Sequence, residues 1–272
     1  MQAGNRQLTE VFSTGDARNP GASFDSYLPA PHLRHGIRAY RFFDLDAAST
    51  YTVPAWTRNM MLFRLGDFFH ARFPDGRRVP HLHASFFGPT TRPLTYGGEE
   101  GRFSFVAVEF QPLVMAALLR EELTEFTDRV VGARGFCDRS LIDALMERLL
   151  GSSGTESLCA ALDRFFTRWL PESVPEPEPG VRRLVAHLRR SRETPSIRRL
   201  KEISGMSERT LRRKFTGVTG LSPRLYQAIL RAERTFGIIY HNPEARAADI
   251  VDACGYSDQA HLIHEVRRLA LA

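Results

Sequence analysis

Three arginines in one short basic segment, Arg209, Arg212 and Arg213, have the side-chain type and the spacing for a definable chemistry. At about 100° per residue in a helix, they gather opposite Leu211 and Phe215, so that a cationic face points away from an apolar one. Arginine forks match phosphate oxygens and the acceptor edge of guanine in the DNA major groove. The segment therefore predicts a recognition helix, although an exposed helix kept soluble by arginine is an equal alternative for this segment alone.

The residues before this segment can position it as the second half of a helix-turn-helix. A first helix follows from i, i+3, i+4, i+7 spacing and ends at Thr194-Pro195, with apolar positions at Val181, Leu184, Val185 and Leu188. Ser196 can cap a second helix that stops at Gly205. The apolar positions of this second helix are Ile197, Leu200 and Ile203. Ser207 can then cap the helix that carries the arginines, with Glu208 at its positive end.

The same layout recurs 50 residues later, which favours the DNA-binding interpretation. Residues 247–254 predict a short helix, Gly255 a turn, and Ser257, followed by acidic Asp258, an N-cap. The helix that follows turns Leu262, Val266 and Leu269 inward and exposes Ala260, His261, His264, Arg267 and Arg268. A long helix from Pro223 to Tyr240 can hold the two units apart, and two such units can enter successive major grooves about 34 Å apart.

The charge of the chain is concentrated around these two units. Of 272 residues with a formal net charge of +6, residues 181–272 hold 18 Lys and Arg against nine Asp and Glu. Residues 1–180 hold 19 against 22 and are slightly acidic. A polyanionic partner is therefore expected to meet the C-terminal third.

The rest of the chain predicts a second domain. Residues 171–180, with four prolines and three glutamates, indicate an extended linker, so we expect domains at 1–170 and 181–272. Five segments upstream read as strands of a small β-sandwich or barrel: residues 36–43, 60–65, 68–73, 84–87 and 103–110. In the last, Val106, Val108 and Phe110 share one face. The expected fold class is thus α+β with two domains, the second all-α.

A helical pair is expected between the strands and the linker. Leu141, Leu145 and Leu149 share one face, and a second apolar stripe follows the glycine-serine turn at 151–154. The second stripe is formed by Leu158, Leu162, Phe165, Phe166 and Trp169. These stripes either cover the sheet or form a dimer contact.

At this point the residues resemble the arabinose-regulator (AraC) family of bacterial transcription factors. The resemblance covers about residues 181–269 and is carried by Leu200-x-Glu202-x-x-Gly205-x-Ser207-x-x-x-Leu211-x-x-x-Phe215-x-x-x-x-Gly220-x-Ser222-Pro223, then Arg231, then Ile250-x-x-x-x-Gly255-Tyr256-x-Asp258-Gln259-x-His261. The N-terminal part is similar to the cupin-like sensor domain of one branch of these regulators. That similarity is carried by Phe87-Gly88-Pro89, by residues 105–112 and by Glu122-Leu123-Thr124.

The resemblance implies a cytoplasmic, sequence-specific transcription regulator that reads double-stranded DNA. It also implies a homodimer, a small-molecule effector bound by the N-terminal domain, and contact with RNA polymerase. The expected DNA-binding residues are Ser207, Arg209, Thr210, Arg212, Arg213, Lys214, Ser257, Gln259, Ala260, His261, His264, Arg267 and Arg268.

The second unit departs from the family pattern. Leu262 and Val266 stand where aromatic residues are usual, His264 stands where arginine is usual, and the sequence stops before the segment that normally closes the domain. We therefore expect the first unit to dominate binding. The alternative is a truncated regulator that acts as a protein-interaction module without binding DNA by itself.

An enzyme, a metal site and a cofactor are not expected. His81-x-His83 resembles a metal pair of cupins, but no glutamate follows closely, and His32, His35 and His70 complete no site. A catalytic cupin fused to a DNA-binding domain stays an alternative. Glu99-Glu100 and Glu121-Glu122 are interpreted as solvated faces or helix-end charges. Cys137, Cys159 and Cys254 are expected to be reduced, and no apolar run is long enough to cross a membrane.

Overall fold

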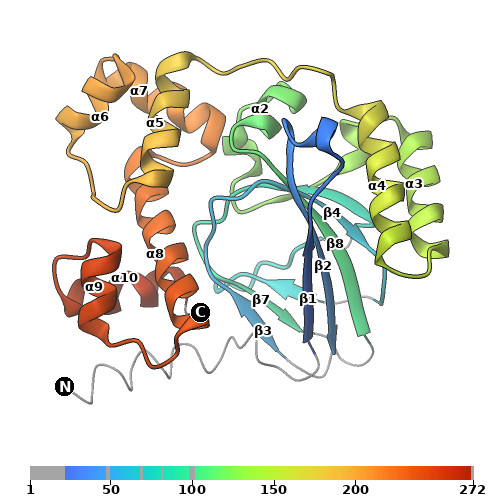
Figure 1. Ribbon diagram of the computed structural model, residues 1–272, viewed down its shortest axis with the longest axis horizontal. Coiled ribbons are helices and arrows are strands. Elements are labelled where there is room, and N and C mark those ends of the chain that lie inside the picture. Colours follow the sequence, from blue (N-terminus) through green and yellow to red (C-terminus); the bar gives the residue numbers. More distant parts are fainter. Residues whose placement is uncertain (1–21, 47–49, 68–69, 81, 98–101, 271–272) are drawn as a thin grey trace.

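The computed structural model describes residues 22–46, 50–67, 70–80, 82–97 and 102–270. A sheet-rich N-terminal domain and a helical C-terminal domain lie side by side, and one extended segment joins them (Figure 1). None of the helices in these ranges is both long and apolar enough to cross a membrane.

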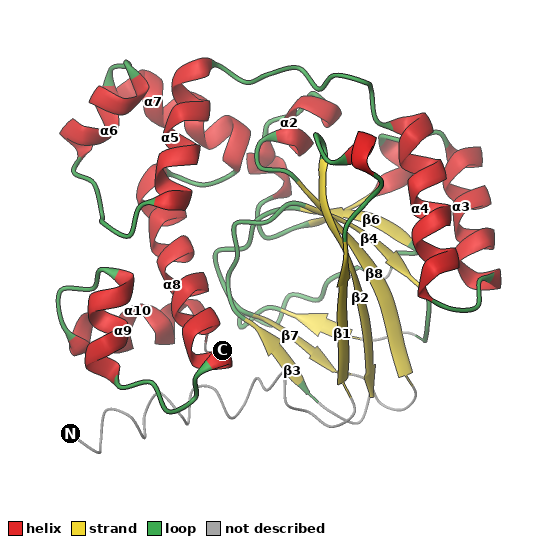
Figure 2. Cartoon of the chain, viewed as in Figure 1, coloured by secondary structure: helices red, strands yellow, loops and turns green. Residues whose placement is uncertain are grey.

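Two antiparallel sheets form the N-terminal domain (Figure 2). The larger has the order β1 (Ala22–Tyr27), β2 (Ile37–Asp46), β8 (Arg102–Phe110), β4 (Met60–Arg64), β6 (Ala84–Phe87) and β9 (Val130–Gly132). The smaller has the order β3 (Tyr51–Val53), β7 (Leu94–Gly97) and β5 (His70–Arg72). This arrangement confirms the expected cupin-like sandwich and adds four short or terminal strands, β1, β3, β7 and β9, that the sequence did not predict.

Strand β8 serves two cores because its side chains alternate between the faces of the large sheet. Val106, Val108 and Phe110 pack on the helix-covered side. Ala107 and Phe105 face the space between the sheets. The period-two prediction is confirmed, and burial on both faces explains why residues 105–108 are all apolar.

Helices cover one face of the large sheet. They are α3 (Arg139–Gly151) and α4 (Thr155–Trp169), which lie side by side at the edge of the molecule (Figure 1), and the short α2 (Val114–Leu119). Leu145, Leu149, Leu162 and Phe166 join the same core as Phe86 of the sheet. Helices α3 and α4 therefore cover the sheet, which was one of the two roles expected for their apolar stripes. The other role, a dimer contact, stays a prediction. Short 3₁₀ turns complete the domain at η1 (Pro31–Leu33), η2 (Leu123–Phe126) and η3 (Ala133–Gly135).

The segment between the domains has no helix or strand from residue 171 to residue 178. Helix α5 (Pro179–Arg190) begins two residues inside the predicted linker. The carboxylate of Glu178 accepts a hydrogen bond from the amide of Val181 at 3.3 Å, and a proline at the first helical position needs no donor there. These two effects start the helix earlier than its apolar pattern suggests.

The C-terminal domain continues with α6 (Ile197–Ser204), α7 (Glu208–Thr219), α8 (Pro223–His241), α9 (Ala247–Cys254) and α10 (Gln259–Ala270). One apolar core joins α5 to α8. A second core joins the end of α8 to α9 and α10. Helix α8 runs between the two cores, as the predicted connecting helix should (Figure 1).

Candidate nucleic-acid interface

The first helix-turn-helix is built from local hydrogen bonds that its sequence dictates. The Ser196 hydroxyl accepts from the amide of Arg199 at 3.3 Å and starts α6. Gly205 ends α6 with a φ of 71°, a left-handed conformation that glycine adopts without strain. The Ser207 hydroxyl accepts from the amide of Thr210 at 3.4 Å and starts α7. All three predicted signals are confirmed.

Helix α7 presents its cations as the sequence predicted. Leu211 and Phe215 are 1% and 0% exposed, while Arg209, Arg212 and Arg213 are exposed. Within the described ranges, these three guanidinium groups have no hydrogen-bond or ion-pair partner, so their donors are free to meet phosphate or base acceptors. Ser207 is exposed, and Thr210 and Lys214 are half-buried.

One inward prediction in the first unit is wrong. Ile197, assigned to the apolar face of α6, is 47% exposed. Ile197 is the first residue of α6, and the buried residues of this helix begin one turn later, at Leu200.

The second unit repeats this architecture with one change at the start of its recognition helix. Gly255 ends α9 with a φ of 74°. Helix α10 begins at Gln259, and the Asp258 carboxylate accepts from the amide of His261 at 2.7 Å. Ser257, predicted as the N-cap, instead hydrogen-bonds to Asp258 and to the ring of His261. The prediction of Ser257 is wrong because the adjacent carboxylate is the stronger acceptor.

The cap also changes the electrostatics of Asp258. The amide of His261 and the hydroxyl of Ser257 both donate to this carboxylate, which holds the pKa of Asp258 below its usual value. The acid therefore stays ionised at the positive end of α10.

The two faces of α10 also agree with prediction. Leu262, Val266 and Leu269 are each 0% exposed, so these aliphatic side chains are completely buried. The outward residues Gln259, Ala260, His264, Arg267 and Arg268 are exposed, and His261 is half-buried. The second recognition helix is thus fully packed, with two free arginines only near its C-terminal end.

A buried ion pair fixes α10 against α8. Arg231 donates to both carboxylate oxygens of Glu265, at 2.7 and 2.6 Å, and the two side chains are 9% and 8% exposed. Arg231 also donates to Thr194, which precedes α6, and its guanidinium lies over the ring of Tyr256. One side chain therefore joins the first unit, the connecting helix and the second recognition helix.

The N-terminal domain touches both recognition helices. The Thr127 hydroxyl, just after η2, donates to the carbonyl oxygen of Gly220 at the end of α7, at 2.9 Å. The amide of Ala55 donates to the carbonyl oxygen of Leu269 in α10, at 2.8 Å. Neither contact was predicted, because each joins residues far apart in sequence.

An acidic residue faces the cations of α7 across a crevice. Glu122 and Thr124 of the N-terminal domain line it opposite Arg212, Arg213 and Thr216, with a volume of about 630 Å³. The interpretation of Glu122 as a solvated charge is therefore incomplete, since it stands beside the recognition helix. Glu99 and Glu100 lie outside the described residues.

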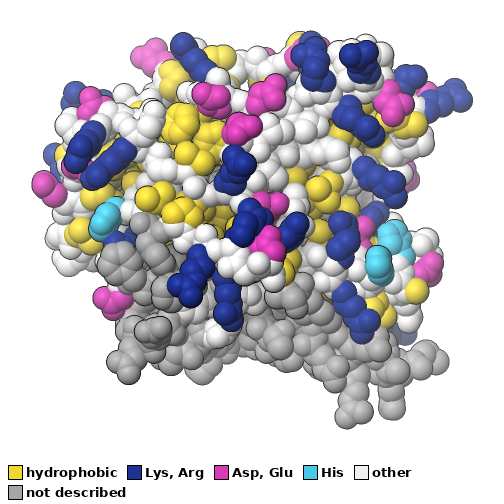
Figure 3. Space-filling view, turned by 180° about the vertical axis from the view of Figure 1, so that it is seen from behind, with side chains coloured by type: hydrophobic (Ala, Val, Ile, Leu, Met, Phe, Trp, Pro, Cys, Tyr) yellow, Lys and Arg dark blue, Asp and Glu magenta, His cyan; other side chains and the backbone are white. Residues whose placement is uncertain are grey.

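The rear view of the molecule shows the distribution of charge. Its right-hand side, formed by the C-terminal domain, carries a series of Lys and Arg side chains with histidines among them (Figure 3). This face continues the charge asymmetry of the sequence.

The described histidines form no metal-binding cluster of three with Cys, Asp or Glu. His83 lies within 3.1 Å of an Arg64 nitrogen, His32 bonds to Thr167, and His35 to the carbonyl oxygens of His32 and Pro171. His81 lies outside the described residues. The cysteines are free thiols, and burial raises the pKa of Cys137 to about 12 and that of Cys159 to about 11.

Comparison with known proteins agrees with this geometry. Residues 200–270 match the model of a helix-turn-helix domain, and residues 25–132 match a domain of unknown function (DUF6597). No curated protein matches in sequence. ToxT from Vibrio cholerae, solved at 1.65 Å resolution, is similar over 86% of this chain and 94% of its own, with 8% identity and a TM-score of 0.50. ToxT from strain O395 bound to (E)-4-(8-methylnaphthalen-1-yl)but-3-enoic acid covers 86% and 95%, with 8% identity and a TM-score of 0.50.

The fold and the matches define a two-domain protein in which a sheet-rich, cupin-like domain precedes two helix-turn-helix units. Residues 200–270 form a helix-turn-helix domain, and 86% of the chain shares the two-domain fold of ToxT.

Proposed function

We propose that this chain is a sequence-specific, non-enzymatic transcription regulator that reads double-stranded DNA with α7 and α10. The observation that carries the proposal is the free, exposed cationic face formed by Arg209, Arg212 and Arg213 on a capped helix. Phosphate neutralisation by these arginines supplies most of the affinity, and contacts to base edges supply the discrimination.

The first unit contributes more than the second. Helix α7 offers three free guanidinium groups along its exposed face, whereas α10 offers His261 and His264 at the corresponding positions. The ring of His261 hydrogen-bonds to the Ser257 hydroxyl, so α10 has fewer strong donors for DNA than α7.

We further propose that the N-terminal domain modulates this binding through η2. Glu121 and Glu122 precede this turn and Glu125 lies within it, and the turn packs on the end of α7. When α7 enters a DNA groove, the DNA phosphates come near these carboxylates. The repulsion between the negative charges then weakens DNA binding as long as η2 stays packed on α7. A small-molecule effector that shifts η2 would change the repulsion between these carboxylates and the DNA phosphates. A homodimer would bind two DNA half-sites. The ToxT structure with a bound organic acid supports the effector.

Selection of bound DNA from a random library with the full-length protein tests the proposal. We expect one enriched motif, which the Arg212→Ala variant binds about 1–3 kcal/mol more weakly. Binding of the enriched motif by the wild-type protein should weaken steeply with salt. The matched control is Arg164→Ala, which removes an exposed arginine of α4 remote from both units.

Four outcomes decide between the alternatives. A motif spanning two grooves means that both units read DNA, and a motif confined to one groove means that α7 reads alone. His261→Ala and His264→Ala losses equal to that of Arg212→Ala would contradict the dominance of the first unit. No enrichment would favour a protein-interaction module instead.

A further inference from the structure

The buried faces of the two recognition helices align at an offset of 51 residues, one more than the spacing of the two serines before them. Two pairs of buried side chains set this offset: Leu211 with Leu262, and Phe215 with Val266. The caps agree, because Ser207 and Asp258 each accept from the amide three residues further on. The offset shows which residues of α10 take the places of the three arginines of α7.

At this offset, apolar residues replace two of those arginines. The corresponding pairs are Arg209 with Ala260, Arg212 with Ile263, and Arg213 with His264. Of the three residues on α10, only His264 can carry a charge. Ile263 was not among the expected DNA-binding residues, because the sequence alone does not show that α10 begins one residue late.

Ile263 is held in place while part of it stays accessible. Its side chain packs against the core that joins α8, α9 and α10, and the residue is half-buried. A branched side chain such as isoleucine has one strongly preferred rotamer in a helix. Ala260 lies one turn earlier on the same face and is exposed. The two side chains therefore present a fixed apolar surface beside His264.

The major-groove edges of the base pairs give the two recognition helices different partners. Arginine pairs with the O6 and N7 acceptors of guanine, whereas apolar side chains contact the methyl group of thymine. Gln259, exposed at the start of α10, carries an amide that matches N6 and N7 of adenine. Helix α7 therefore suits G·C pairs, and α10 suits A·T pairs.

We propose that the chain reads a bipartite DNA site, with guanines in the groove that receives α7 and A·T pairs in the next groove, which receives α10. Ile263 and Ala260 contact thymine methyl groups, and Gln259 pairs with adenine. Ile263 determines the preference of the second half of the site. This inference rests on the proposed function and names the base composition of its DNA partner.

The two halves of this site have a fixed separation. The buried pair of Arg231 and Glu265 holds α10 against α8, and the hydrogen bond from Arg231 to Thr194 fixes the segment before α6. Helices that enter successive major grooves read centres about 10 base pairs apart. We expect the guanine half and the A·T half at this one spacing.

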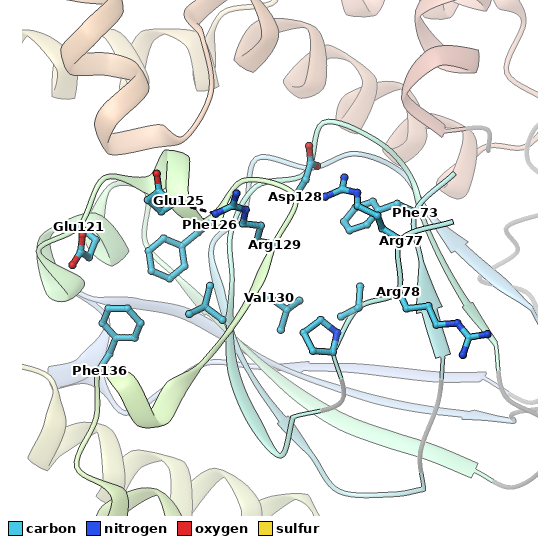
Figure 4. A pocket seen from close by; sticks show the side chains of 13 residues that line it. Phe73, Arg77, Arg78, Glu121, Glu125, Phe126, Asp128, Arg129, Val130 and Phe136 are labelled. Carbon is cyan, nitrogen blue, oxygen red and sulfur yellow. Dashed lines mark hydrogen bonds and ion pairs between the residues drawn. The ribbon is translucent and has the colours of Figure 1, made fainter. Parts of the chain in front are cut away.

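The cavity of about 590 Å³ beside β9 does not extend the cationic surface (Figure 4). Three arginines and three carboxylates line it: Arg77, Arg78, Arg129, Glu121, Glu125 and Asp128. Arg129 pairs with Glu125 at 3.3 Å, and Arg77 pairs with Asp75 at 2.9 Å. Because the charges of this wall balance, the base preference is assigned to α7 and α10 alone.

Random-library selection with the full-length protein, repeated with Ile263→Arg, tests the base preference. Arg212→Ala identifies the half of the motif that α7 reads, because the loss of this arginine relaxes the preference in that groove. We expect thymine and adenine to dominate the other half for the wild type. Ile263→Arg should shift one position there toward guanine, and the gain of a new preference requires a folded helix.

Deoxyuridine tests the methyl contact itself, because it differs from thymidine only by the missing 5-methyl group. In anisotropy titrations, deoxyuridine at the thymine that contacts Ile263 should weaken binding of the wild type about fourfold. The Ile263→Ala variant should bind the two DNAs equally. The control Leu150→Ala, which truncates a side chain of α3 that is 60% exposed, should keep the fourfold difference.

An enriched motif that is confined to the groove of α7, or whose second half prefers G·C pairs, would overturn this inference alone. Equal effects of deoxyuridine on the wild type and on Ile263→Ala at every thymine of the second half would do the same. In both cases the proposed function would stand, because DNA would still be read. Absence of any enriched motif would overturn the proposed function and this inference together.

Discussion

Asp258 and Ser257 stand side by side before the second recognition helix, yet only the carboxylate of Asp258 caps it. In the first unit the corresponding Ser207 does cap α7, because Glu208 is already inside the helix. A serine followed by an acidic residue thus takes different roles in the two units, because the second helix begins one residue later. At this scale, the geometry of a single acceptor decides where a helix starts.

Replacing Asp258 by alanine should destabilise the folded chain more than replacing Ser257 by alanine. Since the pKa of Asp258 is lower in the folded protein than its ordinary 3.8, ionisation stabilises the fold above that value. This contribution is lost as the pH falls through the lowered pKa. Urea unfolding should therefore show a constant difference between wild type and Asp258→Ala from pH 7 to about pH 5, which shrinks in stronger acid. An equal effect of Ser257→Ala at pH 7 would refute this assignment.

The site residues were predictable where local pattern governs them. Helical spacing alone placed Arg209, Arg212 and Arg213 outside, because Leu211 and Phe215 must be buried on the other side. Glu122 is exposed, as predicted, but its position beside α7 was not predictable, because α7 lies about 90 residues further along the chain and no local signal joins the two.

At the scale of elements, the helices and five of the strands were predictable, whereas β1, β3, β7 and β9 were not. Strands β3 and β9 have three residues each, too few to show a period of two. Their place in the sheets depends on partners far away in sequence, such as the pairing of Phe86 with Val131. The helix-turn-helix units needed no such partners, since caps or glycine turns mark most of their helix boundaries.

The joint between η2 and α7 depends on a glycine. A Cβ at Gly220 would lie 2.5 Å from the Thr127 hydroxyl and 2.8 Å from the Leu123 carbonyl oxygen, and its φ is +73°. We expect Gly220→Ala to lower the free energy of unfolding by at least about 1–2 kcal/mol. Gly217→Ala is the control, because its nearest contact would be an ordinary 3.5 Å to Glu122 and alanine favours a helix. Urea unfolding that gave equal losses for both variants would contradict this account.

The ion pair between α8 and α10 permits a double-mutant test. Arg231→Met leaves Glu265 buried without its partner, which should cost about 3–5 kcal/mol. The double variant Arg231→Met with Glu265→Leu should recover most of that stability, because two apolar side chains can fill the same space. Urea unfolding of the four proteins measures the coupling. If stability recovers but DNA binding does not, the role of the ion pair is to orient α10. If stability does not recover, the folded chain depends on contacts of Arg231 other than the one with Glu265.

At the scale of the whole molecule, the N-terminal domain contacts α7 and α10 at their C-terminal ends. Thr127 bonds to the end of α7, Ala55 bonds to Leu269 of α10, and the amide of Thr57 donates to Glu233 of α8 at 3.0 Å. The two helix-turn-helix units are thus held by one surface. A change in that surface can therefore reach both units together, so the proposed modulation needs no contact between the N-terminal domain and DNA.

Glu122→Gln tests this control through charge alone. Removing the carboxylate beside Arg212 and Arg213 should raise the affinity of the full-length protein for its selected DNA about two- to fivefold at low salt. The gain should fade at high salt, because the repulsion between Glu122 and the phosphates is screened. Fluorescence anisotropy with labelled DNA at several salt concentrations measures it, with Glu147→Gln on α3 as the control of equal charge change. An unchanged or lower affinity of Glu122→Gln would mean that the acidic turn does not oppose DNA, and that modulation must pass through the backbone contacts at Gly220 and Leu269 instead.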